Sequence, residues 1–89
     1  MRKTLLHRRA TAYLRRMPAP RRNQMLDALE QVAELDDISN HAGIRAMSGT
    51  HNGWYRLRVG TYRAVLKPEQ RGGKDVLYVD YIGPRGDAY

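Results

Sequence analysis

The apolar residues change their spacing near the middle of the 89-residue chain, and this change limits what the chain can fold into. Residues 8–17 and 21–36 repeat apolar side chains at intervals of three and four, the pattern of a helix with one buried face. Beyond residue 36 the pattern alternates between apolar and polar positions, as in a half-buried strand. Because 89 residues suffice for only one core, we predict a single α+β domain over residues 1–89.

The boundaries of the expected elements follow from the residues that interrupt each pattern. Pro18 and Pro20 separate the two helices and make them a helical hairpin. The predicted strands cover residues 43–47, 54–59, 62–66 and 75–82, and residues 3–7 offer a weaker fifth strand. The segment 68–74, rich in glycine and charge, is expected to be a turn. The strand over 75–82 is the most apolar and is therefore expected in the interior of the sheet.

The charge of the chain indicates what kind of partner it meets. Sixteen Lys and Arg against nine Asp and Glu give a net charge of +7, which favours nucleic acid, an anionic surface or an acidic protein. The chain has no cysteine, which excludes disulfides, thiolate zinc sites and a thiol nucleophile. His7, His41 and His51 lack the spacing of metal ligands, and no apolar run is long enough to span a membrane. We expect a soluble cytoplasmic protein without a metal or cofactor.

A hairpin turn makes the sharpest prediction about a site. If Gly60 and Thr61 form a two-residue turn, Arg58 lies directly opposite Arg63, and Arg56 is on the same face. Like charges that face each other across strands destabilise a sheet by tenths of a kcal/mol to about 1 kcal/mol. Such a group therefore indicates a bound anion, and phosphate fits the guanidinium fork well. The other interpretation is that these side chains extend into solvent or pair with acids such as Asp80.

Two sequence motifs and the helical hairpin resemble the RelE/ParE superfamily of toxins from type II toxin–antitoxin systems. The first motif is Gly-Trp-Tyr-Arg-Leu-Arg-Val-Gly-Thr-Tyr-Arg-Ala-Val at residues 53–65, and the second is Ile-Gly-Pro-Arg-Gly-Asp-Ala-Tyr at residues 82–89. The helical hairpin, which ends in Leu-Arg-Arg-Met-Pro, and residues 44–49 also match. The resemblance implies a twisted, mainly antiparallel sheet of four or five strands, with an N-terminal helical hairpin packed on one face.

The resemblance also implies an activity. RelE-like members cut mRNA in the ribosomal A site without a metal, and ParE-like members inhibit DNA gyrase. The implied catalytic residues are Arg63, Arg85, Tyr89 and Arg56, and the implied RNA-binding residues are Arg45, Arg58, Trp54 and His51. Arg56 stands where relatives often have lysine, and an arginine does not readily act as a general base. His51 is the nearest imidazole, and Trp54 could stack on a base or cap an edge of the core.

The expected function is therefore that of a ribosome-dependent mRNA endoribonuclease that inhibits translation. Its expected partners are the ribosome with its mRNA and a cognate antitoxin, a net-acidic and partly disordered protein that folds as it binds. Operator DNA would be bound through the antitoxin, and no membrane is involved. Two alternatives stay open: a ParE-like gyrase inhibitor, and a basic nucleic-acid-binding domain without catalytic activity.

Overall fold

The predicted helical hairpin forms the N-terminal part of the fold. In the computed structural model, which describes residues 1–84, α1 (Arg8–Arg16) and α2 (Ala19–Glu34) follow a short strand, β1 (Lys3–Leu6). Pro18 lies between the two helices and is the N-cap of α2, as expected for a proline at a helix boundary. Two short 3₁₀ helices, η1 (Ile38–Asn40) and η2 (Gly49–His51), lie in the connections that follow.

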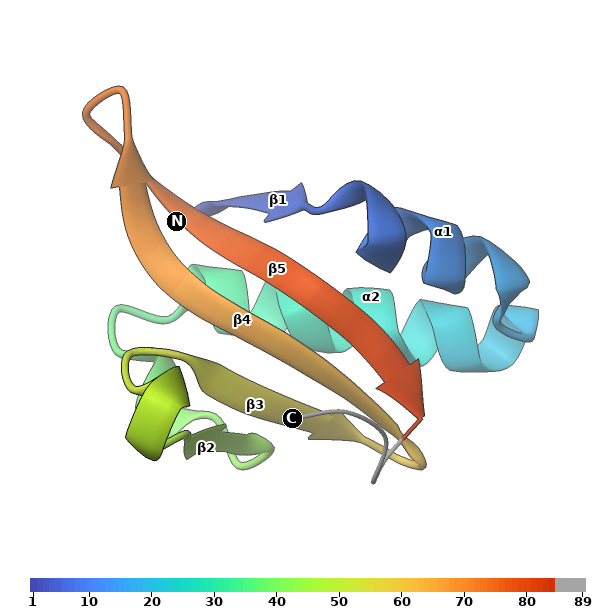
Figure 1. Cartoon of the computed structure of the whole chain (residues 1–89). Helices are drawn as coiled ribbons and strands as arrows, with labels where there is room; N and C mark the ends of the chain where they lie inside the picture. Colours follow the sequence, from blue (N-terminus) through green and yellow to red (C-terminus); the bar gives the residue numbers. More distant parts are fainter. Residues whose placement is uncertain (85–89) are drawn as a thin grey trace.

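The strands form one five-stranded sheet in the order β1-β5-β4-β3-β2 (Figure 1). The later strands are β2 (Ile44–Ala46), β3 (Tyr55–Val59), β4 (Tyr62–Arg71) and β5 (Lys74–Pro84). β1 runs parallel to β5, and the other neighbours are antiparallel. The expected α+β fold is therefore confirmed, the fifth strand is present, and the apolar segment 75–82 lies in an interior strand.

The helices cover one face of this sheet and bury its apolar side chains. The core cluster includes residues of both helices and of the strands: Ala10, Leu14, Met25, Leu29, Val32, Leu57, Ala64, Leu66, Leu77, Val79 and Ile82. Figure 1 shows α2 behind β4 and β5, and α1 beyond the β5 side of the sheet. We call the sheet face that neither helix covers the open face.

The prediction that residues 68–74 form a turn is wrong. β4 continues to Arg71, and the turn is confined to Gly72 and Gly73, whose φ angles are 58° and 78°. The pairing of β3 with β4 ends at Leu66, so Pro68 lies where β4 is paired only with β5. A residue without an N–H is tolerated in a strand that has one free edge.

A β-bulge in β5 adjusts the strand to its apolar pattern. Val65 pairs with Tyr81 while Leu66 pairs with Val79, so Asp80 is an extra residue without a partner on β4. The bulge lets Val79 and Ile82 both face the core although three positions separate them. It also turns Tyr81 to the open face, beside Val65.

Truncation of the core at the middle strand should destabilise the fold strongly. Leu66 is fully buried at the centre of β4, and we expect Leu66→Ala to lower the free energy of unfolding by about 2–5 kcal/mol through lost contacts and a cavity. Leu26→Ala is the matched control, because Leu26 is 43% exposed on α2 and should cost less than about 1 kcal/mol. Urea unfolding measures both, and equal losses would contradict this description of the core.

Candidate functional site

The β3–β4 hairpin has the register that the two-residue turn predicted. Val59 pairs with Tyr62 and Arg58 pairs with Arg63, on either side of the turn. Gly60 has a φ of 58°, the left-handed conformation that the first position of such a turn requires. The two arginines are therefore direct neighbours across the strands, on the open face.

The edge strand β2 adds Arg45 to the arginines of β3 and β4. Arg45 pairs with Arg56, so two pairs of arginines face each other across the β2–β3–β4 part of the sheet. We call Arg45, Arg56, Arg58 and Arg63 the arginine cluster. The structure thus brings together four of the residues that the sequence predicted for the site.

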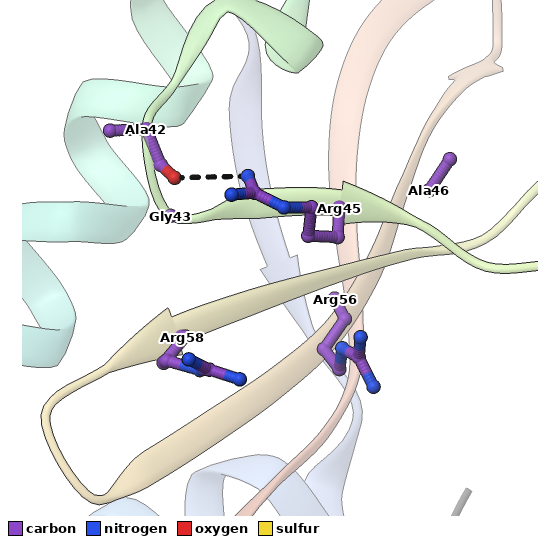
Figure 2. A pocket seen from close by; sticks show the side chains of 6 residues that line it. All are labelled: Ala42, Gly43, Arg45, Ala46, Arg56 and Arg58. Atoms are coloured by element: carbon purple, nitrogen blue, oxygen red, sulfur yellow. Dashed lines mark hydrogen bonds between the residues drawn. The ribbon is translucent and has the colours of Figure 1, made fainter.

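A cavity of about 320 Å³ lies over the β2–β3 side of the cluster. Its lining consists of Ala42, Gly43, Arg45, Ala46, Arg56 and Arg58. Figure 2 shows Arg56 and Arg58 extending from β3, whereas Arg45 turns back along β2. The Arg45 guanidinium donates hydrogen bonds to the carbonyl oxygens of Ala42 (3.2 Å) and Ile44 (2.8 Å). These acceptors hold the side chain without neutralising its charge.

No carboxylate among residues 1–84 forms an ion pair with an arginine that lines this cavity. Within residues 1–84, the guanidinium groups of Arg56 and Arg58 have no hydrogen-bond or ion-pair partner. Asp80, the acid considered as an internal partner, forms its ion pair with Arg9 of α1. The Arg9 Nε also donates to the backbone carbonyl of Asp80 at 2.9 Å, which fixes the pair at the bulge. The positive charges of Arg56 and Arg58 are therefore available to an external anion.

Arg63 occupies the protected centre of the cluster. Only 8% of its surface is exposed, and it is the one charged residue that is buried in the described part of the chain. It lies between Arg58 on β3 and Gly83 on β5. A cation in this position interacts with an anion more strongly than a surface cation does, because less water screens it.

Trp54 belongs to a second group on the open face. The Lys67 ammonium lies 4.5 Å from the centre of the Trp54 ring. The ring centres of Trp54 and Tyr78 are 6.2 Å apart. The Arg71 guanidinium covers Tyr78 at 4.7 Å. Glu69 binds Lys67 and Arg71, and the hydrogen bond from Arg71 is the main reason that the pKa of Glu69 is lowered. We call these five residues the stacked cluster.

The stacked cluster was missed by the sequence analysis except for Trp54. Lys67, Glu69 and Arg71 occupy every second position of β4, which is the spacing of side chains on one face of a strand. The prediction of a turn over residues 68–74 excluded this interpretation. His51, the imidazole candidate, lies in η2 and does not line the arginine cavity. Arg85 and Tyr89, also predicted for the site, lie outside the described residues.

The described residues provide no metal site. No group of three His, Asp or Glu side chains among residues 1–84 is placed to hold a metal ion. No helix in that range is long and apolar enough to cross a membrane. The arginine cluster contributes fixed guanidinium groups, which can neutralise and orient an anion such as phosphate.

Removal of one charge from the cluster should stabilise the free protein. Arg56→Gln relieves repulsion from Arg45, and we expect it to raise the free energy of unfolding by about 0.3–1 kcal/mol at low salt. The gain should shrink at high salt, because salt screens the repulsion. Arg56→Lys is the matched control that keeps the charge and should show no such gain. Urea unfolding at two ionic strengths measures these free energies. A lower stability of Arg56→Gln would contradict the prediction that Arg45 and Arg56 repel each other.

No family model and no curated protein match this sequence. Solved structures do match, with sequence identities of 15–21%. A YoeB/ParE toxin from Agrobacterium tumefaciens superposes with a TM-score of 0.78 at 15% identity, over 93% of this chain and 98% of that one.

Two archaeal complexes give similar matches. The RelE–RelB complex from Pyrococcus horikoshii has a TM-score of 0.74 at 19% identity, over 98% of both chains. The RelB–RelE antitoxin–toxin complex from Methanococcus jannaschii has a TM-score of 0.68 at 21% identity, over 91% of this chain and 89% of that one. The likeness extends over nearly the whole domain, so the chain shares the fold of these YoeB/ParE and RelE proteins, as the resemblance of its sequence motifs implied.

Proposed function

We propose that this chain is the toxin of a type II toxin–antitoxin system and that it cleaves mRNA on the ribosome. The observation that carries the proposal is the arginine cluster, whose members Arg56 and Arg58 have no internal counter-charge within residues 1–84. Repulsion among these residues lowers stability, so a benefit in binding a polyanion accounts for their arrangement. The fold shared with RelE proteins supports the same function.

The proposed reaction is attack of an RNA 2′-hydroxyl on the adjacent phosphorus, with departure of the 5′-oxygen. Charge accumulates on the phosphoryl oxygens as the transition state forms, and fixed cations that are already in place stabilise it. Arg63 would contact the scissile phosphate from its protected position, and Arg58 would support it from the adjacent strand. Arg85 and Tyr89 remain part of the proposed site through the family resemblance.

Arg56 affects the proposed mechanism, because a guanidinium is a poor general base. In this chain the rate enhancement would come mainly from orientation of the RNA and from neutralisation of the phosphate. Arg45 and Arg56 would bind flanking phosphates along the cavity over β2 and β3. Proton transfer would then depend on groups outside the cluster, including those that the ribosome supplies in the A site.

We propose a small acidic antitoxin as the protein partner, acting with the toxin in the cytoplasm. The two archaeal structures of similar fold are complexes of RelE with RelB. An acidic segment that folds over the open face would meet a complementary potential and cover the arginine cluster. Operator DNA would be recognised by the complex through the antitoxin.

A gyrase inhibitor is the second candidate, because one of the similar structures is described as a YoeB/ParE toxin. The same positive face would then contact an acidic surface of the enzyme or its DNA. A binding domain without catalysis is the remaining outcome. The three possibilities differ in what happens to mRNA and to DNA supercoiling.

A translation extract with primer extension on a reporter mRNA tests the proposal. We expect ribosome-dependent cuts with the wild-type chain and a loss of at least about 100-fold in Arg63→Ala, because a preorganised donor to the transition state is removed. Arg21→Ala is the matched control, since Arg21 is exposed on α2, on the other side of the sheet, and should leave cleavage unchanged.

The outcome also separates the alternatives. Intact mRNA together with blocked supercoiling by purified gyrase would replace the nuclease proposal with the gyrase one. Intact mRNA together with normal supercoiling would favour the remaining possibility, a nucleic-acid-binding domain without catalytic activity. Equal cleavage by the wild-type chain and Arg63→Ala would remove Arg63 from the site.

A further inference from the structure

The residues of the open face form rows that cross the strands. One row runs from Arg56 through Val65 to Tyr81, and the next runs from Arg58 through Arg63 to Gly83. Tyr81 is in the first row only because the bulge at Asp80 shifts the register of β5. The second row therefore contains two cations and, at its third position, a residue without a side chain.

Gly83 leaves space that the Tyr81 side chain fills. A Cβ atom built on Gly83 would lie 2.1 Å from the Tyr81 hydroxyl oxygen and 2.5 Å from the Cζ of its ring. The ring thus extends along β5 over the glycine. Its hydroxyl occupies the position that a side chain of residue 83 would otherwise take.

This position places the hydroxyl beside Arg63. Opposed residues in an antiparallel pair have Cβ atoms roughly 5 Å apart, and Gly83 is the partner of Arg63. The Tyr81 oxygen, close to the missing Cβ of Gly83, is therefore within the length of the Arg63 side chain. The Tyr81 hydroxyl is thus a third hydrogen-bond donor in line with the side chains of Arg58 and Arg63.

The environment of Tyr81 permits contact with a ligand. The residue is half-buried, and it also borders a cavity of about 260 Å³ whose lining includes Arg9 and Arg16 of α1. A phenol O–H among cations cannot compensate their charge, but it can donate to an anion that they attract. Arg58, Arg63 and Tyr81 would then present donors to one phosphate from three adjacent strand positions.

We infer that the Tyr81 hydroxyl is a further binding residue of the anion site and donates a hydrogen bond to the phosphate that Arg58 and Arg63 bind. This inference extends the proposed function by adding a neutral donor to the cationic ones. Gly83 has a part in it as well, because any larger residue there would displace the hydroxyl.

Titration with inorganic phosphate at constant ionic strength tests the inference without RNA. In an NMR titration of the whole chain, the ring signals of Tyr81 should shift with those of the arginine cluster. Tyr81→Phe should weaken phosphate binding by about 10-fold, the effect of one lost hydrogen bond to a charged group. Gly83→Ala should weaken it similarly, because the new Cβ displaces the hydroxyl.

Tyr78→Phe is the matched control. Tyr78 lies on the same strand and face, but it contacts Trp54 and Arg71 in the stacked cluster, so its loss of a hydroxyl should leave phosphate affinity unchanged. Melting temperatures of all variants show whether they fold. Wild-type phosphate affinity in a folded Tyr81→Phe protein would overturn the inference.

The cleavage assay extends the test to the proposed substrate. At saturating ribosome concentration, Tyr81→Phe should cut mRNA about 10- to 100-fold more slowly, with an unchanged melting temperature. An unaltered rate would overturn the assignment of Tyr81 to the scissile phosphate. If the wild-type chain cuts no mRNA at all, the nuclease proposal fails by itself, and the phosphate titration still decides whether Tyr81 belongs to the anion site.

Discussion

The register of the β3–β4 hairpin is the constraint on which the rest of the structure depends. Side chains alternate between the two faces of a sheet, so a slip of one residue would exchange every inward position with an outward one. In the observed register Leu57 and Ala64 pair inside the core, while Arg58 and Arg63 pair on the open face. The two-residue turn at Gly60 holds this alignment. This tight turn thus determines which residues of β3 and β4 face the core and which face the open side.

The two faces of the sheet have opposite energetic roles. The helix-covered face buries the apolar residues that stabilise the fold, whereas the open face holds like charges that weaken it. Asp80, at the bulge of β5, forms its ion pair with Arg9 of α1. Binding sites often retain such unfavourable local arrangements, which the remaining structure compensates.

Much of the site could be predicted from the sequence, because a two-residue loop between alternating strands allows only one register. Arg58 and Arg63 followed from that rule alone, and the pairing of Arg45 with Arg56 then required the position of β2. The length of β4 could not be predicted, since proline is compatible with a strand only if one of its edges is free, and that depends on where β3 ends. Tyr81 was missed for a related reason. Alternation counted from Leu77 assigns it to the core, and only the bulge at Asp80 reverses its direction.

The parallel pairing of β1 with β5 has a consequence for synthesis of the chain. Lys3–Leu6 pair with Val76–Val79, so most of the sequence lies between these two neighbouring strands. Contacts between residues so distant in sequence form late, because the intervening chain must lose much of its conformational freedom first. The nascent polypeptide therefore cannot complete this sheet until β5 has left the ribosome. Arg58, Arg63 and the Tyr81 hydroxyl, which lies over Gly83 of β5, come together only at that last stage.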